Sequence, residues 1–164
     1  MSLLQIVVLL VAAQRLTELI IARRNTVRLL AAGGYEVGGA HYPLFVLLHG
    51  AWLGALLLFI PPGAPAIWPL LGLFALLQLG RVWVIASLAG RWTTRIIVCP
   101  DEPLSRRGPY RYLRHPNYVI VVVEIAVLPL AFGAWQIALV FSILNLALLT
   151  WRVRAEDRAL GALR

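Results

Sequence analysis

Four long apolar stretches dominate the sequence, and each is at least as long as a helix that crosses a lipid bilayer. The stretches are Leu3–Ala22, Pro43–Ile60, Ile67–Ala89 and Tyr118–Trp151. A membrane-spanning helix needs about 20 mostly apolar residues, within a range of about 17–25. The fourth stretch is too long for one helix and contains Pro129 and Gly133. We therefore expect a hairpin of two helices there, Tyr118–Ala131 and Ala134–Trp151.

The composition supports a lipid environment for most of the chain. Of its 164 residues, 61% are hydrophobic and only 13% are charged, whereas soluble domains carry about 25% charged residues. The chain begins without a positively charged segment, so we expect the first stretch to remain as a membrane helix rather than to be a cleaved signal. The single cysteine, Cys99, excludes a disulfide framework within the chain and a cysteine-rich metal site. The expected fold is all-α: one polytopic membrane helical bundle over residues 1–164, with about five transmembrane helices.

The positions of the arginines predict the orientation of these helices. The net charge is +8 and every basic residue is an arginine. The arginines follow the first, third and fifth crossings as three groups: Arg23, Arg24 and Arg28; Arg91, Arg95, Arg106, Arg107, Arg111 and Arg114; Arg152, Arg154, Arg158 and Arg164. Cytoplasmic loops are enriched in basic residues, so we expect the N-terminus outside and the C-terminus in the cytoplasm. This orientation accounts for the charge without a nucleic-acid partner, and a bacterial inner membrane is the expected location.

Ionisable residues within the membrane stretches are costly and are therefore candidates for function. Arg15 and Glu18 are three residues apart on one helix and can pair, while Arg81 and Glu124 can pair across the bundle. These residues either hold helices together or line a pathway for a transported solute. We expect three further polar residues to form hydrogen bonds between helices: His49, Gln78 and Asn145.

The segment from Glu102 to Tyr118 has the most informative sequence, Glu-Pro-Leu-Ser-Arg-Arg-Gly-Pro-Tyr-Arg-Tyr-Leu-Arg-His-Pro-Asn-Tyr. Pro116 suits the first turn of a helix, where free backbone N–H groups can bind a carboxylate or hydroxyl. His115, Asn117 and the tyrosines add polar groups nearby. The segment either binds a ligand or anchors the chain at the headgroup level, where arginine and tyrosine are common.

Arg152 and Glu156 are four residues apart at the exit of the last stretch, on one face of a helix. They either form an exposed ion pair worth less than about 1 kcal/mol or belong to a site. In a site, Arg152 can bind a substrate carboxylate or phenolate through two N–H groups, and Glu156 can bind an amine or a ribose hydroxyl.

Taken together, these motifs resemble the isoprenylcysteine carboxyl methyltransferase family. The resemblance rests on Gly-Pro-Tyr-Arg-Tyr-Leu-Arg-His-Pro-Asn-Tyr at 108–118, the following hairpin, and Arg152-x-x-x-Glu156, and it covers roughly Arg91–Leu160. Phospholipid methyltransferases are more distant relatives with the same motif. The resemblance implies a membrane methyltransferase that uses S-adenosyl-L-methionine and releases S-adenosyl-L-homocysteine. It divides the chain into a three-helix scaffold, residues 1–90, and a cofactor-binding and catalytic part, residues 91–164.

The resemblance also implies roles for individual residues. Arg152 corresponds to the arginine at the reacting group of the substrate. The expected cofactor-binding residues are Glu102, Pro103, Leu104, Ser105, Tyr110, His115, Pro116, Asn117, Tyr118 and Glu156. Arg95 lies where the family has a further cofactor contact. The chain departs from the family pattern at Glu102, where a histidine is familiar.

The expected acceptor is a lipophilic molecule that enters from the surrounding membrane lipids. A carboxylate is already ionised at pH 7, and Arg152 would favour the anion of an acidic hydroxyl. A prenylated cysteine, a lipidic phenol and a pyrone all remain open as acceptors, while a phospholipid amine is less favoured because Arg152 would repel a cation. Two other functions remain: an NADPH-dependent sterol-type reductase, and a non-enzymatic small transporter or assembly subunit. The sequence indicates neither a metal site nor an oligomeric state.

Overall fold

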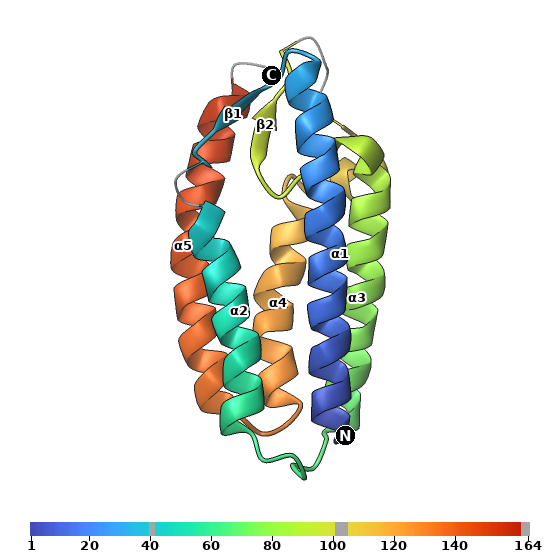
Figure 1. Cartoon of the computed structure of the whole chain (residues 1–164), viewed down its shortest axis with the longest axis vertical. Helices are drawn as coiled ribbons and strands as arrows, with labels where there is room; N and C mark the ends of the chain where they lie inside the picture. Colours follow the sequence, from blue (N-terminus) through green and yellow to red (C-terminus); the bar gives the residue numbers. More distant parts are fainter. Residues whose placement is uncertain (40–41, 101–104, 162–164) are drawn as a thin grey trace.

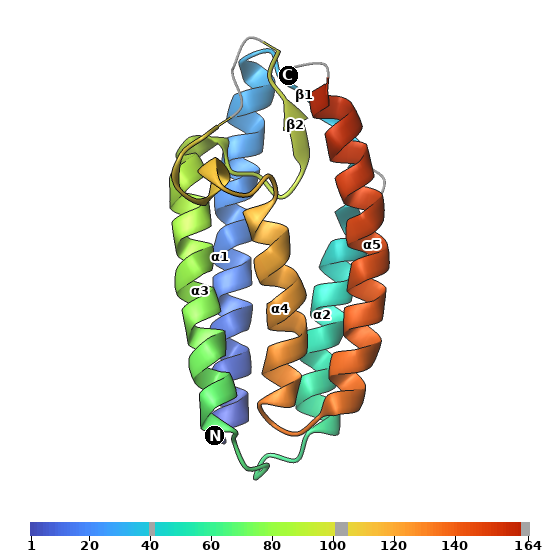
Figure 2. The same cartoon turned by 180° about the vertical axis from the view of Figure 1, so that it is seen from behind.

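The computed structural model describes residues 1–39, 42–100 and 105–161, and within them the chain forms an elongated helical bundle (Figures 1 and 2). The helices are α1 (Leu3–Ala31), α2 (Tyr42–Phe59), α3 (Trp68–Leu88), α4 (Pro116–Leu130) and α5 (Trp135–Gly161). Two short strands, β1 (Tyr35–Val37) and β2 (Ile96–Val98), and two single 3₁₀ turns, η2 (Ala89–Arg91) and η3 (Gly108–Arg111), complete the described elements.

The three arginine-rich segments lie at one end of the bundle. Figure 1 shows α1, α3 and α5 ending at the same end as the two strands, with the N-terminus at the opposite end. We call this the basic end; it comprises the last turns of α1 and α5 and residues 89–100 and 105–115. The arginine groups that follow the first, third and fifth crossings were expected on one side of the bundle, and their common position agrees with this. Which side of a membrane it faces remains a prediction.

Four of the described helices, α1, α2, α3 and α5, are long and apolar enough to cross a bilayer. The remaining one, α4, is apolar but has only 15 residues. Figure 2 shows that α4 begins deeper in the bundle than the points at which α3 and α5 end. The segment before α4 lies above its first turn. The hairpin predicted from Pro129 and Gly133 is present, with Gly133 at φ 74° in the turn.

Two helices continue well past their apolar stretches, so their predicted ends were wrong. α1 runs to Ala31 rather than Ala22, and α5 runs to Gly161 rather than Trp151. Arginine is a good helix former, and an apolar stretch marks only the part of a helix that suits lipid. α1 stops where Gly33 adopts φ 92°, a backbone conformation that glycine accepts at little cost.

A short antiparallel ladder, which the sequence analysis did not predict, joins the two parts of the chain. Tyr35 of β1 faces Val98 of β2, and Val37 faces Ile96. Both β2 residues are buried, at 5% and 1% exposed for Ile96 and Val98. The segment after α1 forms one edge of this ladder.

A cluster of buried apolar side chains forms a hydrophobic core between the cavity described below and the end opposite the strands. Trp52, Leu56, Ile125 and Leu128, from α2 and α4, are fully buried there. Since α4 packs between α3 and α5, as Figure 2 shows, this core fixes its height in the bundle. It thereby fixes the depth at which the His-Pro-Asn-Tyr segment begins.

The three expected interhelical hydrogen bonds have different outcomes. Gln78 donates from α3 to Glu124 of α4 at 3.2 Å, as predicted. His49 bonds the Phe45 carbonyl of its own helix at 2.8 Å, because a carbonyl one turn back is within reach of its ring. Asn145 is fully buried, and neither its Oδ1 nor its Nδ2 has a hydrogen-bond partner in the described residues. For His49 and Asn145 the prediction of a bond between helices was therefore wrong.

Candidate active site

A cavity of about 1250 Å³ lies between the strands at the basic end and the packed core. Its walls come from α1, α2, the segment from the end of α3 through β2, the start of α4 and the last part of α5. Both predicted parts of the chain, residues 1–90 and 91–164, therefore line it. Seven of the predicted site residues line the cavity: Ser105, Tyr110, His115, Asn117, Tyr118, Arg152 and Glu156.

The start of α4 brings the His-Pro-Asn-Tyr segment to the cavity. Pro116 occupies the first helical position, as predicted, and is buried. The amides of Tyr118 and Val119 both donate to the His115 carbonyl, at 3.1 and 3.4 Å. The tight first turn of α4 therefore uses these two amides itself. The side chains of this segment therefore matter more for the site than its backbone.

The Tyr118 hydroxyl connects Arg152 to Glu156. Arg152 Nε donates to the hydroxyl at 2.7 Å, and the hydroxyl donates to a Glu156 carboxylate oxygen. Arg152 is only 7% exposed, and its Nη2 donates to the Thr94 carbonyl at 2.8 Å. The alternative of an exposed Arg152–Glu156 ion pair is therefore wrong. The two side chains belong instead to a hydrogen-bonded group on the cavity wall, in which Arg152 is buried and Glu156 is partly exposed.

The His115 ring lies against Tyr118 and beside two carboxylates. The rings of His115 and Tyr118 stack with centroids 5.2 Å apart and an angle of 14° between their planes. His115 Nδ1 is 3.8 Å from Glu156, and its Nε2 is 3.4 Å from Asp157. Asp157 was not among the predicted site residues, although its position next to Glu156 was the available signal. Of the two acids, Glu156 lines the cavity and gives this part of the wall a negative charge next to the cationic Arg152.

Tyr110 and Ser105 line the cavity from the segment before α4. Burial, together with the nearby Glu156 carboxylate, raises the pKa of the Tyr110 phenol above its usual value. Tyr110 therefore remains a neutral phenol that can donate a hydrogen bond at physiological pH. The predicted residues Glu102, Pro103 and Leu104 lie outside the described residues.

Arg95 has a protein partner on β1. Its Nη1 lies 2.9 Å from both carboxylate oxygens of Glu36, and its guanidinium carbon is 4.6 Å from the centre of the Tyr42 ring. Arg95 lines the cavity, as a cofactor contact would. The ion pair with Glu36 also gives it a role in joining β1 to β2.

Two groups around Arg152 were missed in the sequence. One is the Thr94 carbonyl that accepts from its Nη2, and the other is the Phe45 ring, 5.3 Å from its guanidinium carbon. A backbone carbonyl carries no signal in the sequence. A phenylalanine within a membrane stretch looks like every other apolar residue there. Both groups restrict where the guanidinium can point.

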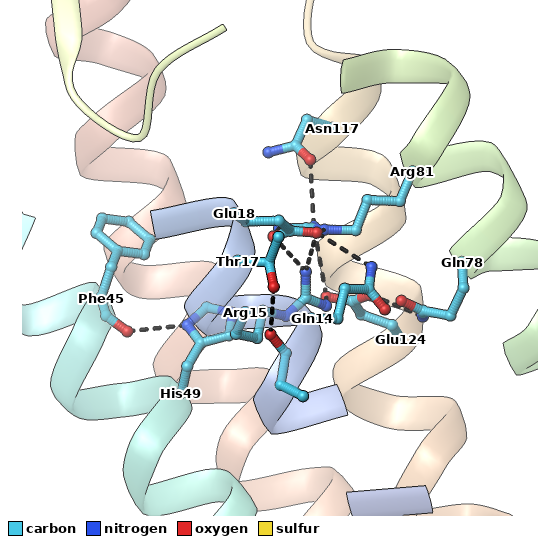
Figure 3. A network of polar contacts seen from close by, with 11 residues as sticks. Gln14, Arg15, Thr17, Glu18, Phe45, His49, Gln78, Arg81, Asn117 and Glu124 are labelled. Atoms are coloured by element: carbon cyan, nitrogen blue, oxygen red, sulfur yellow. Dashed lines mark hydrogen bonds and ion pairs between the residues drawn. The ribbon is translucent and has the colours of Figure 1, made fainter. Parts of the chain in front are cut away.

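A second polar group lies deeper, in the membrane-spanning part of the bundle (Figure 3). We define the buried charge cluster as Arg15, Glu18, Arg81 and Glu124. Arg15 pairs with Glu18 at 3.0 Å and with Glu124 at 2.5 Å. Arg81 pairs with Glu18 at 2.6 Å and lies 3.6 Å from Glu124. Both predicted pairs are thus confirmed. The two arginines and two glutamates balance one another while joining α1, α3 and α4.

The arrangement offers a cation, carboxylates, an imidazole, phenols and an amide around one cavity. Such groups can bind an amino-acid-like or nucleoside-like ligand and can orient an anion next to Arg152. No set of three His, Cys, Asp or Glu side chains placed to hold a metal ion occurs in the described residues.

Comparisons with known proteins agree with this geometry. The model of the isoprenylcysteine carboxyl methyltransferase family matches residues 70–162. The chain is 37% identical over 160 residues to the uncharacterized protein YpbQ of Bacillus subtilis strain 168, which covers 94% of this chain and 95% of YpbQ. It is 28% identical over 160 residues to an uncharacterized protein of Haemophilus influenzae, covering 93% and 92% of the two chains. No solved structure matches the chain. Because the family model covers more than half of the sequence, the chain belongs to the isoprenylcysteine carboxyl methyltransferase family.

Proposed function

We propose that the protein is an S-adenosylmethionine-dependent O-methyltransferase whose acceptor is a carboxylate or acidic hydroxyl of a lipophilic molecule. The observation that carries this proposal is the position of Arg152. Its buried guanidinium is fixed by Tyr118 and Thr94 on the wall of a large cavity. Membership of the methyltransferase family supplies the reaction type.

The residues of the cavity fit this methyl donor. Single-ligand pockets usually measure about 300–1,000 Å³, so a cavity of about 1250 Å³ has room for the donor and part of an acceptor. Glu156 can accept hydrogen bonds from an amine or ribose hydroxyls, and Asn117 and Tyr110 can donate. A positively charged sulfonium group is favoured near a carboxylate, and Glu156 supplies one on the cavity wall.

When bound, S-adenosylmethionine supplies a methyl group whose bond to the sulfonium sulfur breaks as the acceptor oxygen attacks in line, leaving S-adenosylhomocysteine. Arg152 stabilises the anionic form of the acceptor oxygen and holds it in place. An acidic hydroxyl loses its proton to solvent as it binds beside this cation. The Tyr118 hydroxyl keeps the guanidinium oriented, and the apolar surroundings exclude water.

The cavity wall formed by α1 and α2 suits the apolar part of an acceptor. It includes Ala12, Leu16, Leu19, Phe45, Val46 and Leu53. An acceptor chain that lies along these residues places its polar end toward Arg152. The same cation disfavours a phospholipid amine. With the basic end facing the cytoplasm, as basic residues prefer, the soluble methyl donor reaches the site from the side on which it is made.

The test is methyl transfer by the purified protein in detergent or nanodiscs. Tritium from methyl-labelled S-adenosylmethionine should appear in lipophilic acids or phenols but not in matched amines. S-adenosylhomocysteine should raise the melting temperature, because a ligand that binds only the native state stabilises it. Stabilisation by NADPH in place of S-adenosylhomocysteine would point to the reductase alternative. Stabilisation by neither compound would contradict both enzymatic functions.

A further inference from the structure

A continuous chain of three side chains, all of which line the cavity, runs from α1 through α3 to α4. Arg81 of α3 donates to both carboxylate oxygens of Glu18 on α1, through Nε at 2.7 Å and Nη2 at 2.6 Å. Its remaining Nη1 donates to Asn117 Oδ1 at 3.2 Å. Figure 3 shows the Arg81 guanidinium joined to Glu18 on one side and to Asn117 above it. The buried charge cluster is therefore connected to the His-Pro-Asn-Tyr segment.

The geometry of this chain fixes the direction of the Asn117 amide. A guanidinium is planar, so two bonds to Glu18 also determine where Nη1 points. Arg81 is 6% exposed and Glu18 is 6% exposed, and a buried charge of either sign is strongly held by its partner. An arginine can only donate, so Asn117 must present its oxygen to Arg81. Its Nδ2 donor group is then directed away from Arg81, on a side chain that lines the cavity.

Charge balance alone does not require this contact. Arg15 and Arg81 are already neutralised by Glu18 and Glu124 within the cluster. The bond to Asn117 adds no opposite charge, yet it uses the one Arg81 nitrogen that Glu18 leaves available. The contact therefore links the cluster to the site without being needed to neutralise it.

We propose that Arg81, held by Glu18, is a positioning residue that orients the Asn117 amide so that Nδ2 donates a hydrogen bond to the bound methyl donor. This inference rests on the proposed function, in which Asn117 contacts S-adenosylmethionine. It extends the site to α1, which lies outside residues 70–162 matched by the family model. The first helix of the chain then affects cofactor affinity through the orientation of Asn117.

The experiment is a double-mutant cycle between Arg81 and Asn117, read by calorimetric binding of S-adenosylhomocysteine to the full chain in detergent. Arg81→Lys keeps the charge but cannot bond Glu18 and Asn117 through one planar group. It should raise the Kd for S-adenosylhomocysteine by about three- to tenfold, which corresponds to the free energy of one hydrogen bond. Asn117→Ala should raise it by a similar factor. The double variant should bind no more weakly than Asn117→Ala alone, since Arg81 acts through that side chain. In turnover, KM for the donor should rise while kcat is largely retained.

Two further variants separate positioning from stability. Gln78→Met is the matched control, because Gln78 lies on the same helix and bonds the cluster through Glu124 without contacting Asn117. It should bind S-adenosylhomocysteine like the wild type even if it melts lower. Asn117→Asp keeps an oxygen for Arg81 but lacks the Nδ2 donor, so it should fold and still lose affinity. If Arg81→Lys does not fold, the affinity of Asn117→Asp for S-adenosylhomocysteine still tests the inference.

Several results would overturn the inference. One is an Arg81→Lys variant that binds S-adenosylhomocysteine as tightly as the wild type. Another is a double variant whose loss of affinity equals the product of the two single losses. An Asn117→Asp protein that binds as tightly as the wild type would also exclude donation from Nδ2. If the wild type does not bind S-adenosylhomocysteine, the proposed function fails and the ligand named here fails with it. Melting temperatures of the ligand-free variants distinguish this case, because non-additive Arg81 and Asn117 effects show the contact itself to be present.

Discussion

Arg152 and Tyr118 are joined by a hydrogen bond of 2.7 Å from the arginine Nε to the phenolic oxygen. The two residues come from α5 and α4 and are 34 positions apart in the sequence. The same hydroxyl donates to Glu156. One oxygen atom therefore bridges the guanidinium of Arg152 and the carboxylate of Glu156, one turn further along α5. The orientation of Arg152 therefore depends on a residue of the helix that faces it.

Tyr118→Phe should lower kcat by about ten- to a hundredfold, because a hydrogen bond to a charged group is worth about 1.5–3 kcal/mol. The ring and its stacking on His115 are retained, so the fold should be little affected. Transfer of tritiated methyl groups to the best acceptor measures the effect. The control is Tyr112→Phe, since Tyr112 is 76% exposed. Equal rates for the two variants would show that the Tyr118 hydroxyl has no role in turnover.

Arg152→Ala should abolish methyl transfer while leaving the Kd for S-adenosylhomocysteine within about threefold of the wild type. The reason is that Arg152 is placed at the acceptor, and a group acting only on the reacting oxygen changes kcat without changing cofactor binding. Arg154→Ala is the control, because Arg154 is an exposed arginine of the same helix. Loss of binding and turnover by the same factor would contradict this division of roles.

Glu156→Gln should weaken binding of S-adenosylhomocysteine by about tenfold or more, since hydrogen bonds to a charged group are worth about 1.5–3 kcal/mol. His115→Ala should also weaken binding, because the ring lies between Tyr118 and the two carboxylates of α5. Calorimetry on the detergent-purified protein measures both. A Glu156→Gln variant with unchanged affinity would remove this residue from the cofactor site.

Glu124→Leu should destabilise the protein by about 3–5 kcal/mol, the usual cost of removing one partner of a buried charge pair. Glu124 is fully buried and pairs with Arg15 at 2.5 Å, so the substitution leaves two arginines with one glutamate. Glu124→Gln keeps the shape and one acceptor, and it should cost less. Thermal or denaturant unfolding in one detergent ranks the variants. A Glu124→Leu protein as stable as the wild type would mean that the cluster does not hold α1, α3 and α4 together.

The raised pKa of the Tyr110 phenol predicts that the protein loses stability at alkaline pH. Its pKa is raised above the usual value of 10 by burial and by Glu156, so above pH 10 the unfolded chain loses this proton while the folded protein keeps it. The unfolded state then binds fewer protons, and stability falls as pH rises. Tyr110→Phe removes the phenol and with it this pH-dependent contribution to stability. The difference in melting temperature between variant and wild type should be constant from pH 7 to about 9.5 and should then shift in favour of the variant. A constant difference up to pH 11 would contradict the prediction.

The membrane helices could be predicted because the length of an apolar stretch is set by the bilayer. Their ends could not, since α1 and α5 continue as helices through arginine-rich sequence that no longer needs lipid. The β1–β2 ladder was missed for a different reason. Each strand has three residues, and the partners Tyr35 and Val98 are far apart in the sequence, so neither strand carries a periodic pattern of its own.

The candidate site was predictable where it depends on chemically distinctive side chains. His115, Tyr118, Arg152 and Glu156 were all selected from the sequence, and the fold brings them together. The groups that orient Arg152 were not predictable in the same way, because Thr94 contributes a backbone carbonyl. The buried charge cluster was anticipated as pairs, but its link to Asn117 depends on the height of α4 in the bundle, which no local pattern encodes.

The ladder between β1 and β2 has a consequence for biogenesis. Three-residue strands are too short to pair stably by themselves, and the segment between them contains α2 and α3. The two strands can meet only after both of these helices have been inserted and returned the chain to the starting side. A chain with only one of them inserted would leave β1 and β2 on opposite faces of the bilayer. Pairing of the strands is thus a late step that depends on correct threading of the two intervening helices.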